Sequence, residues 1–187
     1  MSIKKYLKIL LIVLLSIFVI YIIYAFTLEE RVLMTKKIEN YIPIYAKMDK
    51  KNTHGGFHND GELLEKIYFS EKQANNFINS AEKNSNWRKL PITERLHNKV
   101  CKHAIDEEMN IPEISNGYWF VLDRHSAAKS KYNEKDIFKE DRYSYNFTVA
   151  VFDIDKNVLY IYELDTWKRK NVCKLFKIYW LYNQIII

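Results

Sequence analysis

Apolar residues dominate the start of the chain. The run from Ile9 to Phe26 contains no charged residue over 18 positions. A helix of that length spans about 27 Å, close to the roughly 30 Å hydrocarbon core of a bilayer. Tyr6, Tyr21 and Tyr24 lie near its ends, where amphipathic rings favour the membrane interface. The pattern predicts a transmembrane helix that anchors the chain in a lipid bilayer.

The same run favours an uncleaved anchor over a signal peptide. A signal peptide has an apolar core of about 7–15 residues, followed by a cleavage site of the small-x-small type. Here the run is longer, and the sequence IYAFTLEE offers no such site. Basic residues are equally numerous on the two sides: Lys4, Lys5 and Lys8 before the run, Arg31, Lys36 and Lys37 after it. Because the short N-terminal segment holds its charges directly against the span, we expect a single-pass protein of the cell membrane with its N-terminus inside and its domain outside the cytoplasm.

The segments after the anchor begin with a mixed region and two short β-type runs. Thr27–Asn40 is charged and is predicted to be a stalk or a continuation of the anchor helix. Tyr41–Met48 contains a proline and is compatible with an edge strand. Glu62–Phe69 predicts a strand that enters the core.

Two amphipathic helices are expected next. Ser70 is a natural N-cap and Gln73 occupies the capping-box position three residues later. The apolar residues that follow have helical spacing: Ala74, Phe77, Ile78 and Ala81. A second helix is predicted from the Thr93 cap, with Leu96 and Val100 on one face.

The second half of the domain is rich in strand patterns. A turn at Ser115–Gly117 precedes the run Tyr118–Leu122. Tyr143–Asp153 and Val158–Leu164 alternate in polarity and flank a short turn, which predicts a hairpin. Because helices and strands segregate along the chain, we expect an α+β fold, with an N-terminal transmembrane helix and a small antiparallel-sheet domain carrying about two helices on one face.

The chain divides into four predicted parts. They are 1–28 (N-terminal cytoplasmic end and anchor), 29–48 (stalk or edge strand), 49–166 (extracytoplasmic α+β domain) and 167–187 (basic-apolar tail).

Charge distribution argues against a nucleic-acid partner. The chain has 29 basic and 23 acidic residues, but three of the basic residues lie before Phe26 and five after Asp165. The folded middle is therefore almost neutral and lacks the basic stripe that nucleic-acid binding requires. Basic residues beside apolar runs are typical of a membrane surface. Cys101 and Cys173 are too few for a disulfide framework, and whether they pair is left open.

The loop NTHGGFHNDGE contains most of the candidate chemistry. It holds three of the four glycines in the chain, and it brings together His54, Gly55, Gly56, His58 and Asp60. Imidazole and carboxylate groups can bind a divalent metal such as zinc. The glycines also permit two tight turns between strands, which explains the loop without any ligand. A turn, a ligand-binding loop and a weak metal site at His54, His58 and His125 all remain open; we expect no resident cofactor.

A second candidate follows the run Tyr118–Leu122. Asp123 and His125 would share one face of a strand, and an aspartate can orient a histidine as a general base. The sequence shows no serine or cysteine nucleophile motif to complete such a site. Surface polar residues at a strand end are therefore the favoured explanation of the pair.

Several blocks of the chain resemble a group of bacterial proteins. These blocks are THGGFHNDGE, NWRKLP, NGYWFVLDRH, YSYNFTVAVFD and LYIYELDT. They look like those of short single-span membrane proteins from low-GC Gram-positive bacteria, over most of Asp49–Thr166. That group has no established activity, so the resemblance implies only a bacterial origin and a membrane anchor.

The sequence thus predicts a membrane-anchored extracytoplasmic domain that binds a protein partner or ligand without catalysis. An immunity or envelope role is compatible with this layout. The alternative is a metal-dependent enzyme that uses His54, His58, Asp60 and His125. A structural envelope component without a discrete ligand is the third hypothesis.

Overall fold

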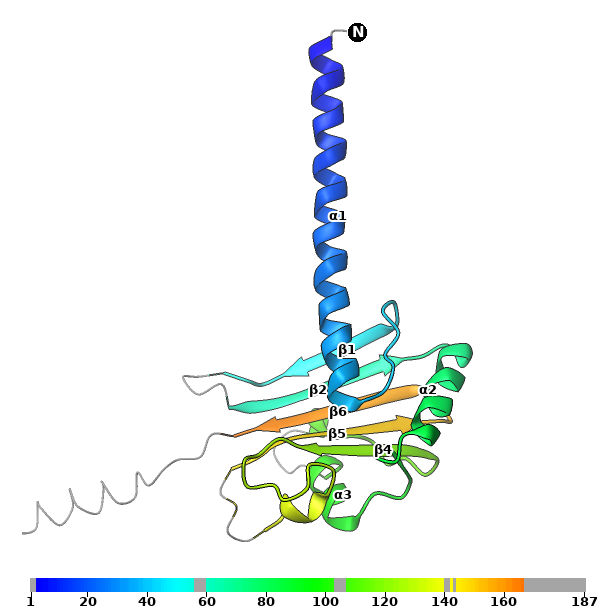
Figure 1. Cartoon of the computed structure of the whole chain (residues 1–187), viewed down its shortest axis with the longest axis vertical. Coiled ribbons are helices and arrows are strands. Elements are labelled where there is room, and N and C mark those ends of the chain that lie inside the picture. The colour runs from blue at the N-terminus through cyan, green and yellow to red at the C-terminus, as the bar shows by residue number, and fades with distance from the viewer. Residues whose placement is uncertain (1–2, 56–59, 103–106, 140–141, 143, 167–187) are drawn as a thin grey trace, which may run out of the picture.

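A computed structural model describes residues 3–55, 60–102, 107–139, 142 and 144–166 (Figure 1). Helix α1 (Ile3–Ile38) is a single helix of 36 residues. Its side chains from Tyr6 through Phe26 are exposed, whereas Arg31, Met34 and Ile38 are buried in the domain. The segment predicted as a stalk or a helical continuation is therefore helical, and it packs into the core.

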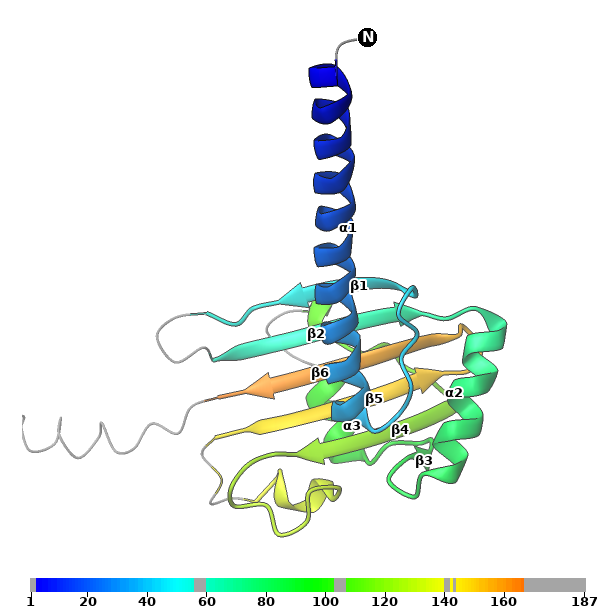
Figure 2. The ribbon, with the colours of Figure 1, turned by 45° about the horizontal axis from the view of Figure 1, so that its top comes forward.

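Six antiparallel strands form one sheet (Figure 2). The spatial order is β1-β2-β6-β5-β4-β3. The strands are β1 (Lys47–Asn52), β2 (Gly61–Tyr68), β3 (Arg88–Lys89), β4 (Gly117–Asp123), β5 (Asn146–Asp153) and β6 (Val158–Asp165). The predicted hairpin is present as β5 and β6, and their register joins Asp153 to Val158. The strands run across the direction of α1, and β1 forms the edge nearest the apolar end of that helix (Figure 1).

Helices cover both faces of the sheet. Helix α2 (Glu71–Lys83) begins at Ser70, whose side chain accepts from the Gln73 backbone while the Gln73 side chain accepts from the Ser70 backbone, so the predicted capping box is confirmed. Helix α3 (Glu94–Val100) begins after Thr93, although the Thr93 hydroxyl makes no cap bond. The short helices η1 (Glu107–Met109) and η2 (Glu134–Asp136) lie in the connections.

Two hydrophobic clusters lie on opposite sides of the sheet because neighbouring strand residues point to opposite faces. On β5, Ala150 and Phe152 face α1 and α2, whereas Phe147, Val149 and Val151 face α3. The α+β class, with an antiparallel sheet and two helices after α1, is thus confirmed. Helix α3 differs from the expectation: its apolar face, Leu96 and Val100, lies on the other side of the sheet.

One predicted strand is shifted along the chain. Tyr41–Met48 is compatible with an edge strand by its sequence, but in the structure Tyr41–Ala46 is a loop and β1 starts at Lys47. The loop runs beside α1, since the Ile42 backbone donates to Thr35 Oγ1 at 3.3 Å. Pairing with β2 determines where β1 begins and ends, because each residue from Lys47 to Asn52 has a partner on β2.

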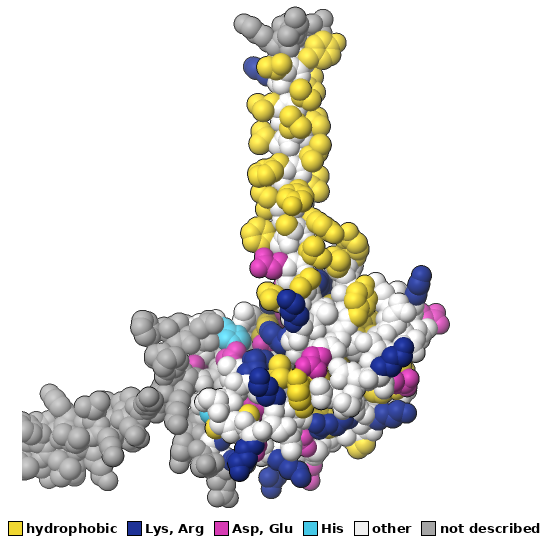
Figure 3. Space-filling model, in the orientation of Figure 1, with side chains coloured by type: hydrophobic (Ala, Val, Ile, Leu, Met, Phe, Trp, Pro, Cys, Tyr) yellow, Lys and Arg dark blue, Asp and Glu magenta, His cyan; other side chains and the backbone are white. Residues whose placement is uncertain are grey.

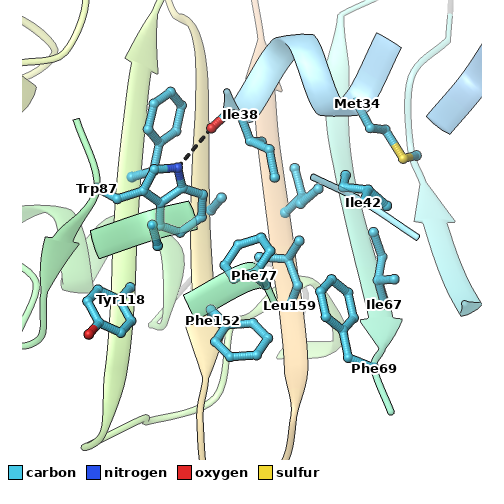
Figure 4. Packing of buried hydrophobic residues seen from close by; sticks show 14 of the residues in the cluster. Met34, Ile38, Ile42, Ile67, Phe69, Phe77, Trp87, Tyr118, Phe152 and Leu159 are labelled. Atoms are coloured by element: carbon cyan, nitrogen blue, oxygen red, sulfur yellow. Dashed lines mark hydrogen bonds between the residues drawn. The ribbon is translucent and has the colours of Figure 1, made fainter. Parts of the chain in front are cut away.

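The end of α1 is held by aromatic packing and hydrogen bonds (Figure 4). The indole Nε1 of Trp87 donates to the backbone oxygen of Ile38 at 2.9 Å. The Trp87 ring also meets Phe77 edge-on at 5.1 Å and stacks on Phe120 at 5.4 Å between centroids. Glu39 then reverses the chain with a φ of 53°, and Asn84 Nδ2 donates to its carbonyl at 3.0 Å. Side chains from outside α1 thereby satisfy backbone groups that a helix end leaves unpaired.

Candidate functional site: a charged row beside the first helix

The sheet face that contacts α1 changes from apolar to charged along β6. Leu159 and Ile161 belong to the apolar cluster, and the next residues of β6 on the same face are Glu163 and Asp165. Together with nearby cations they form a cluster that we call the charged row. Its members are Lys37, His54, Arg124, Glu163 and Asp165.

Glu163 is the centre of the charged row. Its side chain is only 6 % exposed and forms an ion pair with Lys37 of α1. Arg124, which follows β4, places Nη2 3.5 Å from Glu163 Oε2 and 3.6 Å from Asp165 Oδ1. The row therefore joins α1 to the ends of β4 and β6 through charged contacts.

The guanidinium of Arg124 is also fixed from β5. Its Nε donates to Asn146 Oδ1 at 2.7 Å, and its Nη1 donates to Thr148 Oγ1. These bonds hold the planar group in one orientation, which suits recognition of a carboxylate or another planar anion. Because Arg124 and Asp165 keep about a third of their side-chain area exposed (28 % and 36 %), the outer end of the row is accessible to a partner.

His54 lies at that outer end. Its Nδ1 is 2.7 Å from Asn52 Oδ1, and its Nε2 is 3.8 Å from Asp165 Oδ2. The structure thus brings one predicted site residue next to a carboxylate, but that carboxylate comes from β6 rather than from Asp60.

The glycine loop is a hairpin connection between β1 and β2. Thr53 and Glu62 exchange hydrogen bonds, with the Thr53 backbone donating to Glu62 O at 2.9 Å, and Gly55 donates to Asp60 O at 3.2 Å. The candidate residues Gly56 and His58 lie outside the described residues. The part of the loop that is described has the geometry of a turn.

Asp123 and His125 lie together, but their contacts differ from those of a catalytic pair. The Asp123 carboxylate is fully buried and binds Arg142 through two bonds of 2.5 and 2.7 Å. It also accepts from the backbone N–H of His125 at 3.0 Å, so it contacts the histidine main chain. The predicted surface position of Asp123 is therefore wrong, and its role is to hold the loop after β4.

The tautomer of His125 also opposes a role as general base. The backbone N–H of Ala127 donates to Nδ1 at 3.0 Å, so Nδ1 carries no proton. Nε2 of the neutral ring then carries the proton and donates to Ser144 Oγ at 2.9 Å. A serine nucleophile requires the opposite arrangement, in which the histidine accepts the serine proton.

Metal-binding geometry is not present in the part of the chain that the structure describes. Within those residues, no three His, Cys, Asp or Glu side chains gather closely enough to hold an ion. His54 contacts Asn52 and Asp165. His125 contacts Ser144 and Ala127. Cys101 is half-buried, and burial raises the pKa of its thiol to about 11, which keeps the thiol in its unreactive neutral form. Its possible partner Cys173 lies outside the described residues.

A second ionic group lies under α1, next to the charged row. Lys50 Nζ lies 2.8 Å from Glu30 Oε1 and 3.2 Å from Glu65 Oε1. The Glu65 side chain is only 2 % exposed, and burial raises the pKa of its carboxyl despite the opposing effect of Lys50. Burial lowers the pKa of Lys50, but Glu30 and Glu65 together raise it above its ordinary value.

Sequence reasoning missed most of these charged residues. Lys37, Arg124 and Glu163 come from distant parts of the chain, so no local motif connects them. One signal was present: in VLYIYELDT, Glu163 and Asp165 continue the same alternation as the apolar Leu159 and Ile161. An acidic residue at a buried-strand position predicts a cationic partner.

Comparisons with protein-family models, with curated proteins and with solved structures found no match to this chain. The geometry of the chain itself therefore provides the basis for a functional hypothesis.

The structural role of the glycine loop predicts different effects for two of its glycines. A Cβ at Gly61 would lie 2.4 Å from His54 Cα, whereas one at Gly55 would meet nothing closer than Thr53 O at 4.0 Å. We expect Gly61→Ala to lower the free energy of unfolding by more than about 1 kcal/mol. Gly55→Ala, the matched control, should change it by less than about 0.5 kcal/mol. Urea unfolding of the full chain in detergent micelles measures both, and equal effects would contradict this account of the loop.

The two buried glutamates should respond in opposite directions to neutralisation. Because the folded-state pKa of Glu65 is raised, its ionised form costs stability, and that cost appears as the pH rises from the ordinary carboxyl pKa through the raised one. Glu65→Gln should therefore raise the free energy of unfolding at neutral pH and remove this part of the pH dependence. Glu163→Gln removes the negative charge that pairs with Lys37 and lies 3.5 Å from Arg124, and it should lower the free energy of unfolding by about 1–3 kcal/mol. Unfolding curves over a pH series test the pair, and a loss of stability in Glu65→Gln would show that its ion pair outweighs its burial.

Proposed function

We propose that this chain is a single-pass membrane protein whose α+β domain lies outside the cytoplasm and binds a partner or ligand without catalysis. The observation that carries this proposal is the exposure of α1. One helix among the described residues is long and apolar enough to cross a membrane, and no part of its apolar window is buried (Figure 3). A core helix of a soluble protein would instead be covered by the domain.

Polar groups within the apolar part of α1 support a lipid environment. Ser16 Oγ donates to Val13 O at 2.8 Å, and Thr27 Oγ1 donates to Ile23 O at 2.9 Å. Such bonds satisfy hydroxyl groups inside the helix, where a hydrocarbon core provides no water. The end of α1 supports an anchor that is not cleaved from the domain, since Met34 and Ile38 belong to the core of the domain.

The charged row supports binding rather than catalysis. The oriented guanidinium of Arg124 and the partly exposed carboxylate of Asp165 lie side by side. This pair suits a partner segment that carries one negative and one positive charge. The metal-dependent alternative requires His58, which lies outside the described residues. Among the described residues, His54 contacts Asn52 and Asp165, and His125 contacts Ser144 and Ala127.

The anchor is tested by replacing two residues near its centre. Leu14→Arg with Phe18→Arg should abolish membrane integration, because each arginine costs about 2.5–3.5 kcal/mol at the centre of a span. Leu14→Ala with Phe18→Ala is the matched control and should remain in the membrane fraction after alkaline extraction. In intact bacterial spheroplasts, added trypsin should digest the domain of the wild-type chain. Release of the wild type by alkali would contradict the anchor, and protection from trypsin until lysis would contradict the proposed side.

Binding at the charged row is tested by photocrosslinking in the same cells. Leu63 is half-buried and pairs directly with Glu163 across β2 and β6, so a photoreactive residue there faces the row without removing a charge. We expect a defined crosslinked product from position 63 and none from the exposed position 135. Mass spectrometry of the product identifies the partner. Absence of a product at 63, or the same product from both positions, would contradict binding at this row.

A further inference from the structure

Two contacts fix the height of strand β1 along helix α1. Glu30 Oε1 binds Lys50 of β1 at 2.8 Å, and Arg31 Nη2 donates to the backbone oxygen of Ala46 at 2.9 Å, directly before β1. Glu30 and Arg31 follow Phe26, the last residue of the uncharged run, by four and five positions. At 1.5 Å per residue, β1 therefore lies about 6–8 Å along the helix axis from the end of the apolar segment.

This distance is comparable to the thickness of a lipid headgroup layer. A bilayer of about 40–45 Å with a hydrocarbon core of about 30 Å leaves about 5–7 Å of polar region on each side. Because the strands run across the direction of α1 and β1 is the nearest edge, β1 is the strand of the sheet closest to this height (Figure 2). A span that ends at Phe26 brings this edge of the sheet to the membrane surface.

The side chains at this edge suit a membrane interface. Tyr45, directly before Ala46, is 83 % exposed, and Tyr41 in the same loop is 49 % exposed. Tyrosine prefers the interface because one end of its ring is apolar and the other is polar. Figure 3 shows apolar side chains beside the base of α1, continuous with the apolar surface of the helix. The exposed ring of Tyr45 at this height therefore has an apolar environment available only if lipid is present.

Charge contributes less at this edge than the aromatic rings. Lys47 is exposed and suits lipid phosphates, but its Nζ lies 3.8 Å from Asp49 Oδ1. Glu29, which directly precedes Glu30 in α1, is also exposed and adds a negative charge. Lys50 is already occupied by Glu30 and Glu65. The contact is thus expected to depend mainly on the height of β1 along α1, which Glu30 and Arg31 set, while the ring of Tyr45 favours it and Lys47 is a minor contributor.

We propose that a membrane-contact edge, formed by Tyr45, Lys47 and the outer side of β1, rests in the headgroup layer of the bilayer that anchors α1. This inference rests on the proposed function, because it requires α1 to span. Lipid headgroups then cover a strand edge whose outward backbone groups would otherwise remain open to pairing with another strand.

The experiment measures the depth of a nitroxide at position 45. The full chain with Cys101→Ala, Cys173→Ala and Tyr45→Cys is labelled in vesicles of equimolar phosphatidylcholine and phosphatidylglycerol. Collision rates with oxygen and with a water-soluble nickel chelate report the depth. Two reference labels complete the set in the same cysteine-free chain: Phe18→Cys in the middle of the apolar run and Lys135→Cys in η2, on the side of the domain away from the apolar end of α1 (Figure 1).

We expect several-fold lower nickel accessibility at position 45 than at position 135, and a depth between those of positions 135 and 18. If position 18 lies in lipid while position 45 matches position 135, the membrane-contact edge is overturned and the span stands. If position 18 is itself accessible to nickel, the span fails and the edge fails with it. Spin–spin broadening at position 45 that disappears on dilution with unlabelled protein would overturn the proposal in favour of a second copy paired along β1.

Discussion

The carboxyl end of α1 is part of the hydrophobic core, and the arrangement of the other elements depends on this. Met34, Ile38 and Ile42 pack in the cluster that contains Phe77 and Phe152. Trp87 adds a hydrogen bond to the last helical carbonyl, so an unpaired group at the helix end is satisfied inside the domain. The helix therefore cannot be removed from the sheet without exposing the aromatic cluster.

This packing explains why charged residues gather where they do. Helix α2 covers the apolar half of the face, and α1 crosses beside the half where Glu65 and Glu163 replace aliphatic residues. Buried carboxylates require partners, and Lys37 from α1 and Lys50 from β1 provide them. The ionic contacts thus specify where α1 lies on the sheet, while the aromatic contacts provide most of the apolar burial.

Local signals in the sequence predicted much of the fold. The capping box at Ser70 and Gln73, the hairpin around Asp153–Val158 and the uncharged helix each depend on neighbouring residues, and each is present. The start of β1 was missed because KMDKKN has no apolar alternation, and its strand conformation follows from pairing with β2. The charged row was missed for a similar reason. Glu163 meets Lys37 across 126 positions of the chain, so its significance appears only after folding.

Helix α1 has no glycine or proline between Ile3 and Ile38, and so no residue of the kind that usually forms a joint between an anchor and its domain. The proposed span and the domain are therefore expected to move as one rigid unit. A tilt or rotation of α1 in the membrane would turn the sheet by the same angle. The orientation of the charged row and its distance from the membrane surface would then follow from how α1 sits in the bilayer. If α1 spans the bilayer as we propose, the charged row would meet only those partners that lie at one height above the membrane surface.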